Sequence, residues 1–166
     1  MASGWEAVDD YIAERLLGED EALSAALANN KAQGLPPIDV SAAQGKMLSL
    51  LAKAVGARDI LEIGTLGGYS TIWLARALPE GGTLVTLEID RKHAQTARVN
   101  LERAGVSDKV EIRVGPARES LAAMSGEKSF DFVFIDADKQ SNAHYAAEAI
   151  RLGRSGTVIV DDNDRT

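Results

Sequence analysis

Carboxylate side chains end or follow four apolar segments of this 166-residue sequence, at Glu62, Glu88, Asp136 and Asp162. If these segments are neighbouring parallel strands, their carboxyl ends lie at one edge of a sheet, where such sheets bind ligands. Repulsion among carboxylates gathered there is costly without a cation or hydrogen-bond donors. Solvated strand ends are the alternative, because Asp is common in turns, but four ends together favour a shared site.

A glycine-rich turn stands next to the first of these carboxylates. Gly64, Gly67 and Gly68 follow the apolar residues 60–63, and apolar residues then recur at helical spacing. A strand, a tight turn and the start of a helix are therefore predicted. Glycines let a ligand approach the backbone closely, and free N–H groups at a helix start favour anionic groups. A turn that only connects is the alternative, and Glu62 inside the strand end favours the binding turn.

An alternation of strands and helices must position these groups. The sequence predicts strands at residues 59–63, 83–88, 109–114, 130–136 and 157–160. It predicts helices at residues 69–78, 90–104 and 141–152, and a short helix ending near Met124. Apolar strands separated by helices are typical of a parallel sheet covered on both faces. The predicted fold class is therefore α/β, with a doubly wound parallel sheet.

Three helices are predicted before the first strand. Residues 5–30 carry apolar residues at helical intervals, which indicates two amphipathic helices broken near Gly18. Ser41 and Gln44 have capping-box spacing, which predicts the start of a third helix. Its apolar face is predicted to contain Met47, Leu48, Leu51 and Val55.

The composition indicates a globular protein with an acidic balance. Hydrophobic residues make up 45% and charged residues 26%, and the net charge of −7 argues against nucleic acid or anionic membranes as partners. The absence of cysteine excludes disulfides and thiolate metal sites. No leader or membrane-length apolar segment is evident. We expect one cytoplasmic domain, with helices over residues 1–56 and an α/β core over residues 57–166.

Glu88 lies at the end of the second predicted strand. An acid at this place suits hydrogen bonding to a ribose diol, which fits either a dinucleotide or an adenosyl group. The glycines at positions 64, 67 and 68 do not have the G-x-G-x-x-G spacing of dinucleotide-binding proteins. An NAD-linked oxidoreductase is therefore the disfavoured alternative.

Four blocks of the sequence resemble one enzyme family. They are SAAQGK at residues 41–46, LEIGTLGGYS at 61–70, FIDADK at 134–139 and VDDN at 160–163. Their order and spacing are similar to those of the cation-dependent class I S-adenosylmethionine-dependent O-methyltransferases, which include the catechol and caffeoyl-CoA enzymes. The resemblance implies methyl transfer to a hydroxyl of a small vicinal-diol acceptor, of catechol or hydroxycinnamoyl type. A non-catalytic module that binds the cofactor is the alternative.

The resemblance also implies a metal site. Asp136, Asp162 and Asn163 match the ligands of the family, and such an all-oxygen set suits Mg²⁺, Mn²⁺ or Ca²⁺. Lys139 matches the proposed general base of the family, so Lys139 and Asp136 are the expected catalytic residues.

The cofactor implied by the resemblance is S-adenosyl-L-methionine. The residues expected to bind it lie at or just beyond the ends of the first four predicted strands. They are Glu62, Gly64, Thr65, Gly68, Ser70, Glu88, Ile89, Pro116, Ala117 and Asp136.

Several further expectations complete the interpretation. Members of the family usually continue beyond the segment that matches Asn163, so we expect this sequence to lack the last strands of the fold. Homodimerisation is expected from the family. His93, early in a predicted helix, is expected on a solvated face.

Overall fold

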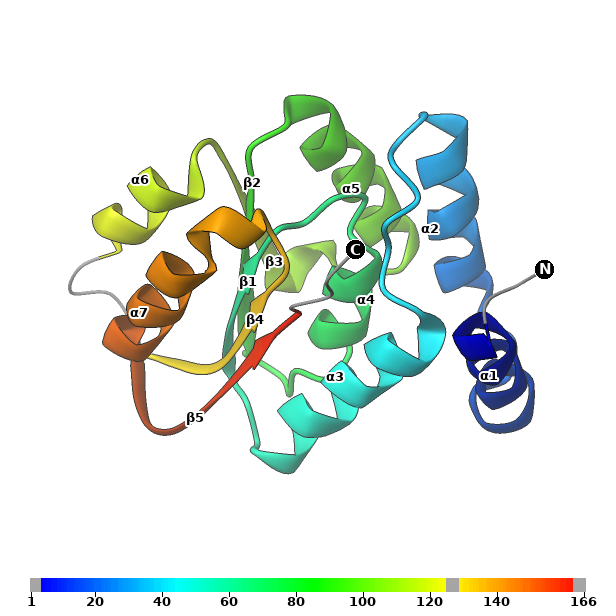
Figure 1. Ribbon diagram of the computed structural model, residues 1–166, viewed down its shortest axis with the longest axis horizontal. Helices are drawn as coiled ribbons and strands as arrows, with labels where there is room; N and C mark the ends of the chain where they lie inside the picture. Colours follow the sequence, from blue (N-terminus) through cyan, green and yellow to red (C-terminus); the bar gives the residue numbers. More distant parts are fainter. Residues whose placement is uncertain (1–3, 125–128, 163–166) are drawn as a thin grey trace.

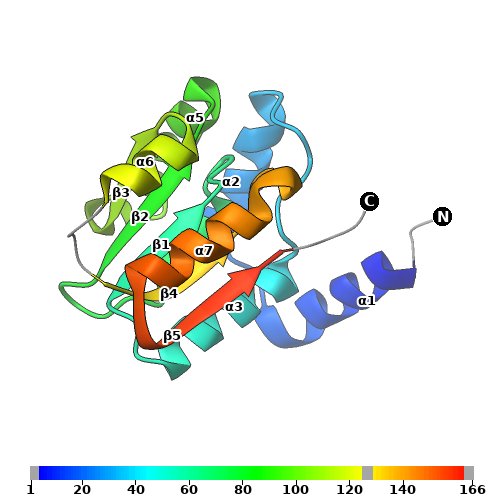
Figure 2. The same ribbon diagram turned by 60° about the vertical axis from the view of Figure 1, so that its left-hand side comes forward.

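The computed structural model describes residues 4–124 and 129–162 and shows a five-stranded sheet between two layers of helices (Figure 1, Figure 2). The strands are β1 (Asp59–Ile63), β2 (Thr83–Glu88), β3 (Val110–Val114), β4 (Phe130–Ile135) and β5 (Gly153–Asp161). Their order in the sheet is β3-β2-β1-β4-β5, and every neighbouring pair is parallel. The predicted doubly wound α/β sheet is confirmed.

The helices also agree with the predicted alternation. They are α1 (Gly4–Ile12), η1 (Ala13–Leu17), α2 (Glu21–Ala32), α3 (Ala42–Ala54), α4 (Tyr69–Ala75), α5 (Arg91–Arg103), η2 (Ser107–Lys109), α6 (Ala117–Ala123), η3 (Lys139–Ser141) and α7 (Asn142–Leu152). Gly18, with a φ of 68°, separates η1 from α2, as predicted. Within the described ranges, no helix has the length and apolarity that crossing a membrane requires.

Each face of the sheet packs against its own set of helices. Alternate strand residues such as Ile60, Leu84 and Phe132 pack with side chains from α2, α3, α4 and α5. The intervening residues, such as Leu61 and Val133, pack with side chains from α6 and α7. Figure 1 shows these two helical layers on opposite sides of the sheet, with α1 at the periphery. This alternation is what period-two side-chain geometry requires of a sheet buried on both faces.

Some element boundaries differ from the prediction. The helix predicted over residues 69–78 ends at Ala75, because Pro79 disfavours helical backbone just before it. Lys109 belongs to η2 and not to the third strand. Strand β5 begins at Gly153, although it was predicted to begin at Thr157, and its pairing with β4 has a register shift between Phe130 and Phe132. Pairing with a neighbouring strand therefore extends β5 beyond its apolar run.

The apolar face predicted for α3 is wrong in part. The capping box of Ser41 and Gln44 is present, which confirms the predicted start. However, Leu48 is the one buried residue of the predicted face; the others, Met47, Leu51 and Val55, are exposed. The helix instead turns its small residues inward, since a Cβ on Gly45 would lie 2.3 Å from the Trp73 ring. Close approach between α3 and α4 thus decides which face is buried.

Candidate functional site

Backbone hydrogen bonds hold the loops after the strands to one another. In each case an N–H just beyond one strand donates to a carbonyl at the end of the neighbouring strand. The pairs are Gly64 to Leu87 (3.0 Å), Gly115 to Glu88 (2.9 Å), Asp136 to Ile63 (2.8 Å) and Asp162 to Ile135 (2.9 Å). The predicted site loops therefore lie side by side at one edge of the sheet, and the strand order reverses between β1 and β4. Ligands of open α/β sheets bind at such a point.

The glycine turn after β1 is tightly constrained. Gly64 has a φ of 102°, and a Cβ on it would lie 1.9 Å from the Asp136 carbonyl oxygen. A Cβ on Gly67 would lie 1.9 Å from the Asn30 side-chain oxygen. Leu66 between them has a φ of 49°, a left-handed conformation that side chains disfavour. Glycine is thus required at 64 and 67 by close approach, and the turn carries strain at Leu66.

Glu88, the predicted ribose acid, is bound to this turn. Its Oε2 accepts hydrogen bonds from the N–H groups of Thr65 (3.2 Å) and Leu66 (2.8 Å), and its Oε1 accepts one from Asp90 (2.9 Å). The side chain is only 7% exposed. A carboxylate held by three backbone donors has a fixed orientation, because charge-assisted bonds of this kind are the strong ones. The structure therefore brings the predicted ribose acid and the glycine turn of the predicted cofactor site together.

Glu62 has a different environment from the other predicted site residues. It is fully buried, and its two oxygens accept hydrogen bonds from the hydroxyls of Ser70 (2.7 Å), Thr71 (2.5 Å) and Thr86 (2.7 Å). Burial raises the pKa of Glu62 to about 7, against the opposing effect of the three hydroxyls. These bonds join β1, β2 and the start of α4 beneath the glycine turn. A direct contact of Glu62 with a cofactor stays a prediction.

The buried Glu62 should make the stability of the fold depend on pH. Its pKa is higher in the folded chain than the ordinary 4.5, so its stabilising contribution is present below pH 4.5 and is lost as the pH rises through 7. In urea unfolding, Glu62→Gln should gain about 3 kcal/mol relative to the wild type between the two pH values. Glu119→Gln, at an exposed position, is the control. Parallel pH profiles for Glu62→Gln and the wild type would contradict the prediction.

The predicted metal and catalytic residues meet after β4 and β5. Lys139 Nζ lies 3.4 Å from Asp136 Oδ1 and donates a hydrogen bond to the Asp162 carbonyl oxygen. Burial and the neighbouring charge of Asp162 raise the pKa of Asp136, and Lys139 opposes them. The third predicted ligand, Asn163, lies outside the described residues. Over the residues described, no group of three His, Cys, Asp or Glu side chains could hold a metal ion.

The remaining predicted residues lie around the same edge. Ile89 is 72% exposed just beyond β2, Pro116 is exposed at the start of α6, and Ala117 is half-buried beside it. Asp138 accepts hydrogen bonds from the Ser141 N–H and the Tyr145 hydroxyl, so it caps η3.

Two side chains near the edge were missed or misplaced by sequence reasoning. His93 was expected on a solvated face, but its side chain is only 22% exposed and Nδ1 lies 3.6 Å from Glu88 Oε1. Asn100, which sequence reasoning did not consider, donates a hydrogen bond to the Gly67 carbonyl. Its one sequence signal is a polar residue in phase with the buried Ala97 and Leu101 of α5.

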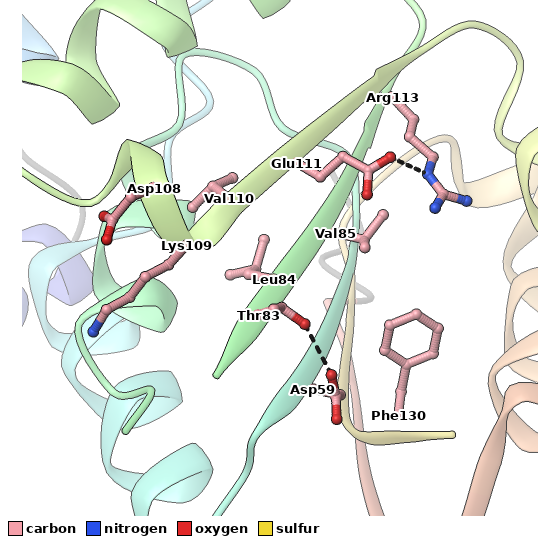
Figure 3. A pocket seen from close by; sticks show the side chains of 10 residues that line it. All are labelled: Asp59, Thr83, Leu84, Val85, Asp108, Lys109, Val110, Glu111, Arg113 and Phe130. Carbon is pink, nitrogen blue, oxygen red and sulfur yellow. Dashed lines mark hydrogen bonds and ion pairs between the residues drawn. The ribbon is translucent and has the colours of Figure 1, made fainter. Parts of the chain in front are cut away.

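Two hollows lie at opposite ends of the sheet. One of about 150 Å³ lies beside Asp162, between α3 and the ends of β4 and β5, with Val40, Met47 and Phe134 in its wall. Another of about 600 Å³ opens at the amino ends of the strands (Figure 3), where Asp59 accepts a hydrogen bond from Thr83. No predicted site residue lines the larger hollow, so its size does not make it the functional site.

Comparison with known proteins finds relatives of one kind over most of the chain. A family model described as O-methyltransferase matches residues 16–165. A catechol O-methyltransferase of Mycobacterium tuberculosis is 58% identical over 156 residues, which are 94% of this chain and 70% of the relative. Caffeoyl-CoA O-methyltransferase 1 of Zea mays is 39% identical over 127 residues, 74% of this chain and 49% of that protein. The crystal structure of an O-methyltransferase from Bacillus cereus in complex with SAH has a TM-score of 0.92 at 55% identity, covering 95% of this chain and 72% of the other.

Proposed function

This chain belongs to the O-methyltransferase family, and on that premise we propose that it methylates one hydroxyl of a small acceptor with two adjacent hydroxyls, using a divalent cation. The coarser function, S-adenosylmethionine-dependent O-methyl transfer, follows from the family and from the SAH-bound relative. The cation, the acceptor and the roles of individual residues are the proposal. The observation that carries it is the meeting of Asp136, Asp162 and Lys139 at the sheet edge that also holds Glu88.

The chain's residues fit S-adenosylmethionine at the glycine turn. Glu88 is fixed by backbone amides at the end of β2, and its Oε1, which accepts one of these bonds, can accept another from a ribose hydroxyl. Gly64 and Gly68 have positive φ, so the backbone after β1 bends sharply next to this acid. The exposed Ile89 offers an apolar surface beside Glu88 for the adenine ring.

The residues also fit a hard divalent cation. Asp136 and Asp162 are two carboxylates close enough for the charge of Asp162 to raise the pKa of Asp136. Mg²⁺, Mn²⁺ and Ca²⁺ prefer oxygen ligands, and two carboxylates close together provide such ligands. Asn163, next in the sequence, would supply an amide oxygen.

The reaction needs a methyl donor, an oriented hydroxyl and an acceptor for its proton. When bound, S-adenosylmethionine supplies a sulfonium methyl group, and the cation would orient the acceptor oxygens and lower their pKa. Glu88 would orient the cofactor through its ribose. Lys139, in contact with Asp136, would take the proton of the attacking hydroxyl when its amine is in the neutral, unprotonated form, and would become the ammonium. Orientation of the two reactants would provide most of the rate increase.

The acceptor site is proposed to lie at the 150 Å³ hollow. Asp162 and Asp161 form its polar end, and apolar side chains such as Met47 and Phe134 form its wall. A small aromatic diol presents an apolar ring and two adjacent oxygens, which match these two ends.

A methylation assay tests the proposal. Catechol and caffeic acid are incubated with labelled S-adenosylmethionine and Mg²⁺, with and without EDTA, and compared with phenol. We expect labelled methyl ether from the diols, loss of activity with EDTA and no product from phenol. Methylation that persists in EDTA would contradict the proposed requirement for a divalent cation. Methylation of phenol would contradict the proposed requirement for two adjacent hydroxyls. SAH binding without turnover of any acceptor would favour a non-catalytic module.

Replacement of Glu88 should weaken cofactor binding. Glu88→Gln loses the charge that the turn amides and, in our proposal, the ribose hydroxyls share. We expect the Kd for SAH to rise by about 10- to 100-fold, because hydrogen bonds to charged groups contribute most. Calorimetric titration measures this, and Glu111→Gln, an exposed carboxylate on β3, is the control. Equal affinities of Glu88→Gln and the wild type for SAH would contradict a role of Glu88 in cofactor binding.

A further inference from the structure

Two buried asparagines connect the N-terminal helix α2 to the glycine turn. Asn100 of α5 uses its side-chain amide to donate to the Gly67 carbonyl (2.8 Å) and to the Asn30 side-chain oxygen (2.9 Å). Asn30 of α2 in turn donates to Asp39 Oδ1 (2.9 Å). Asn30 and Asn100 are 2% and 1% exposed. Two nearly inaccessible amides whose bonds join α2, α5 and the loop before α3 form a specific connection, because each group left unpaired would be costly.

The connection holds the turn at a second point, separate from its contacts with Glu88. Asn100 binds the carbonyl of Gly67, and Glu88 binds the N–H groups of Thr65 and Leu66. Between these contacts Leu66 has its left-handed φ of 49°. Unfavourable backbone conformations persist only where the surroundings over-determine them. Without the Asn100 bond, the turn could relax at Leu66 and move its two N–H groups away from Glu88.

We propose that Asn100, supported by Asn30, positions the glycine turn for cofactor binding. It does this by keeping Leu66 in the left-handed conformation. The inference rests on the proposed placement of S-adenosylmethionine at this turn. It makes α2 part of the cofactor site although α2 lies outside the βα units of the sheet. The path continues through Asn30 to Asp39, which stands next to Val40 in the wall of the hollow beside Asp162.

A double-mutant cycle tests the mechanism, with SAH affinity measured by calorimetry. Asn100→Ala should raise the Kd for SAH by about tenfold. Leu66→Gly removes the side chain that disfavours the left-handed turn, so it should restore most of the lost affinity when added to Asn100→Ala. Val106→Ala, a buried residue just beyond α5, is the control for lost stability and should leave the Kd unchanged.

The outcomes separate this inference from the proposed cofactor site. Absence of SAH binding by the wild type, or no effect of Glu88→Gln, would overturn the cofactor placement itself. Normal SAH affinity in Asn100→Ala would overturn the positioning role alone. A loss that Leu66→Gly does not reduce would mean that the asparagine acts only through general stability. If Asn100→Ala fails to fold, Asn30→Ala, which leaves the bond from Asn100 to Gly67 possible, provides the same comparison with a smaller expected loss.

Discussion

Asp136→Asn is expected to lower kcat/KM for methyl transfer by more than about 100-fold, because a misplaced reacting group alone costs that much. The substitution keeps the size of the side chain and removes its charge. Asp136 is one of the two carboxylates proposed to hold the cation, and it lies 3.4 Å from Lys139. The variant should also lose Mn²⁺ binding in calorimetric titration. Its affinity for SAH should change much less, because in our proposal Glu88, which is bonded to the turn amides, holds the ribose.

The neighbouring Asp161 provides a matched control for this variant. Asp161 accepts a hydrogen bond from the Asn142 side chain (3.0 Å) and also contributes to the raised pKa of Asp136. Asp161→Asn therefore makes the same charge change at the same edge without removing a proposed ligand. It should retain most of the Mn²⁺ affinity and of kcat at saturating acceptor, and only the KM for the acceptor should rise, because Asp161 lines the proposed acceptor site. Equal losses in the two variants would point to the general electrostatics of the edge and would contradict a ligand role for Asp136.

Local signals in the sequence predicted much of the fold. The apolar runs at 59–63 and 83–88 have the bounds of β1 and β2, because strands buried on both faces need continuous apolar side chains. Ser41 and Asp90 start α3 and α5 through side-chain bonds to nearby N–H groups. These features depend on residues close to one another in the chain. A short stretch of sequence is therefore enough to predict them.

Contacts between distant segments could not be predicted in the same way. The bond between Asn100 and Asn30 joins residues separated by 70 positions. The hydroxyl of Thr86 reaches Glu62 from a neighbouring strand, and its register is set by the whole sheet. The buried face of α3 depends on how closely Gly45 approaches α4, so its exposed apolar residues were wrongly expected inside. Each of these features is determined by packing between distant segments. The apolar periodicity of a single segment therefore cannot predict it.

The candidate site shows the same division. Glu88 and Gly64 were predicted from their types and spacing. The structure brings them close together, because the Gly64 N–H donates to the Leu87 carbonyl and the Glu88 carboxylate accepts from the Thr65 N–H. Asn100, which we propose to position the turn, was marked in the sequence only by its phase with buried residues of α5, and His93 near Glu88 was expected in solvent. Residues proposed to touch a ligand were thus found by chemistry, whereas the contacts of Asn100 and His93 required the structure.

Lys139 should be essential for the chemical step. A positioned general base contributes about 10²- to 10⁴-fold to the rate, so Lys139→Met should lower kcat by that factor. The side chain is exposed, approaches Asp136 Oδ1 to 3.4 Å and donates to the Asp162 carbonyl. In the described part of the chain, its bonds are to Asp136 and Asp162 and not to the glycine turn or Glu88. The Kd for SAH should therefore stay close to that of the wild type, which separates this variant from Glu88→Gln.

Lys139→Arg distinguishes proton transfer from charge pairing. Arg keeps a positive charge beside Asp136 and can still donate to the Asp162 carbonyl, but its guanidinium does not release a proton in proteins. If Lys139 accepts the proton of the acceptor hydroxyl, the Lys139→Arg and Lys139→Met variants should both have a low kcat in a steady-state assay with saturating diol. If Lys139 only balances the carboxylates, Arg should recover most of the wild-type kcat, which would contradict the general-base role. Lys53→Met, at an exposed position on α3, should behave as the wild type in the same assay.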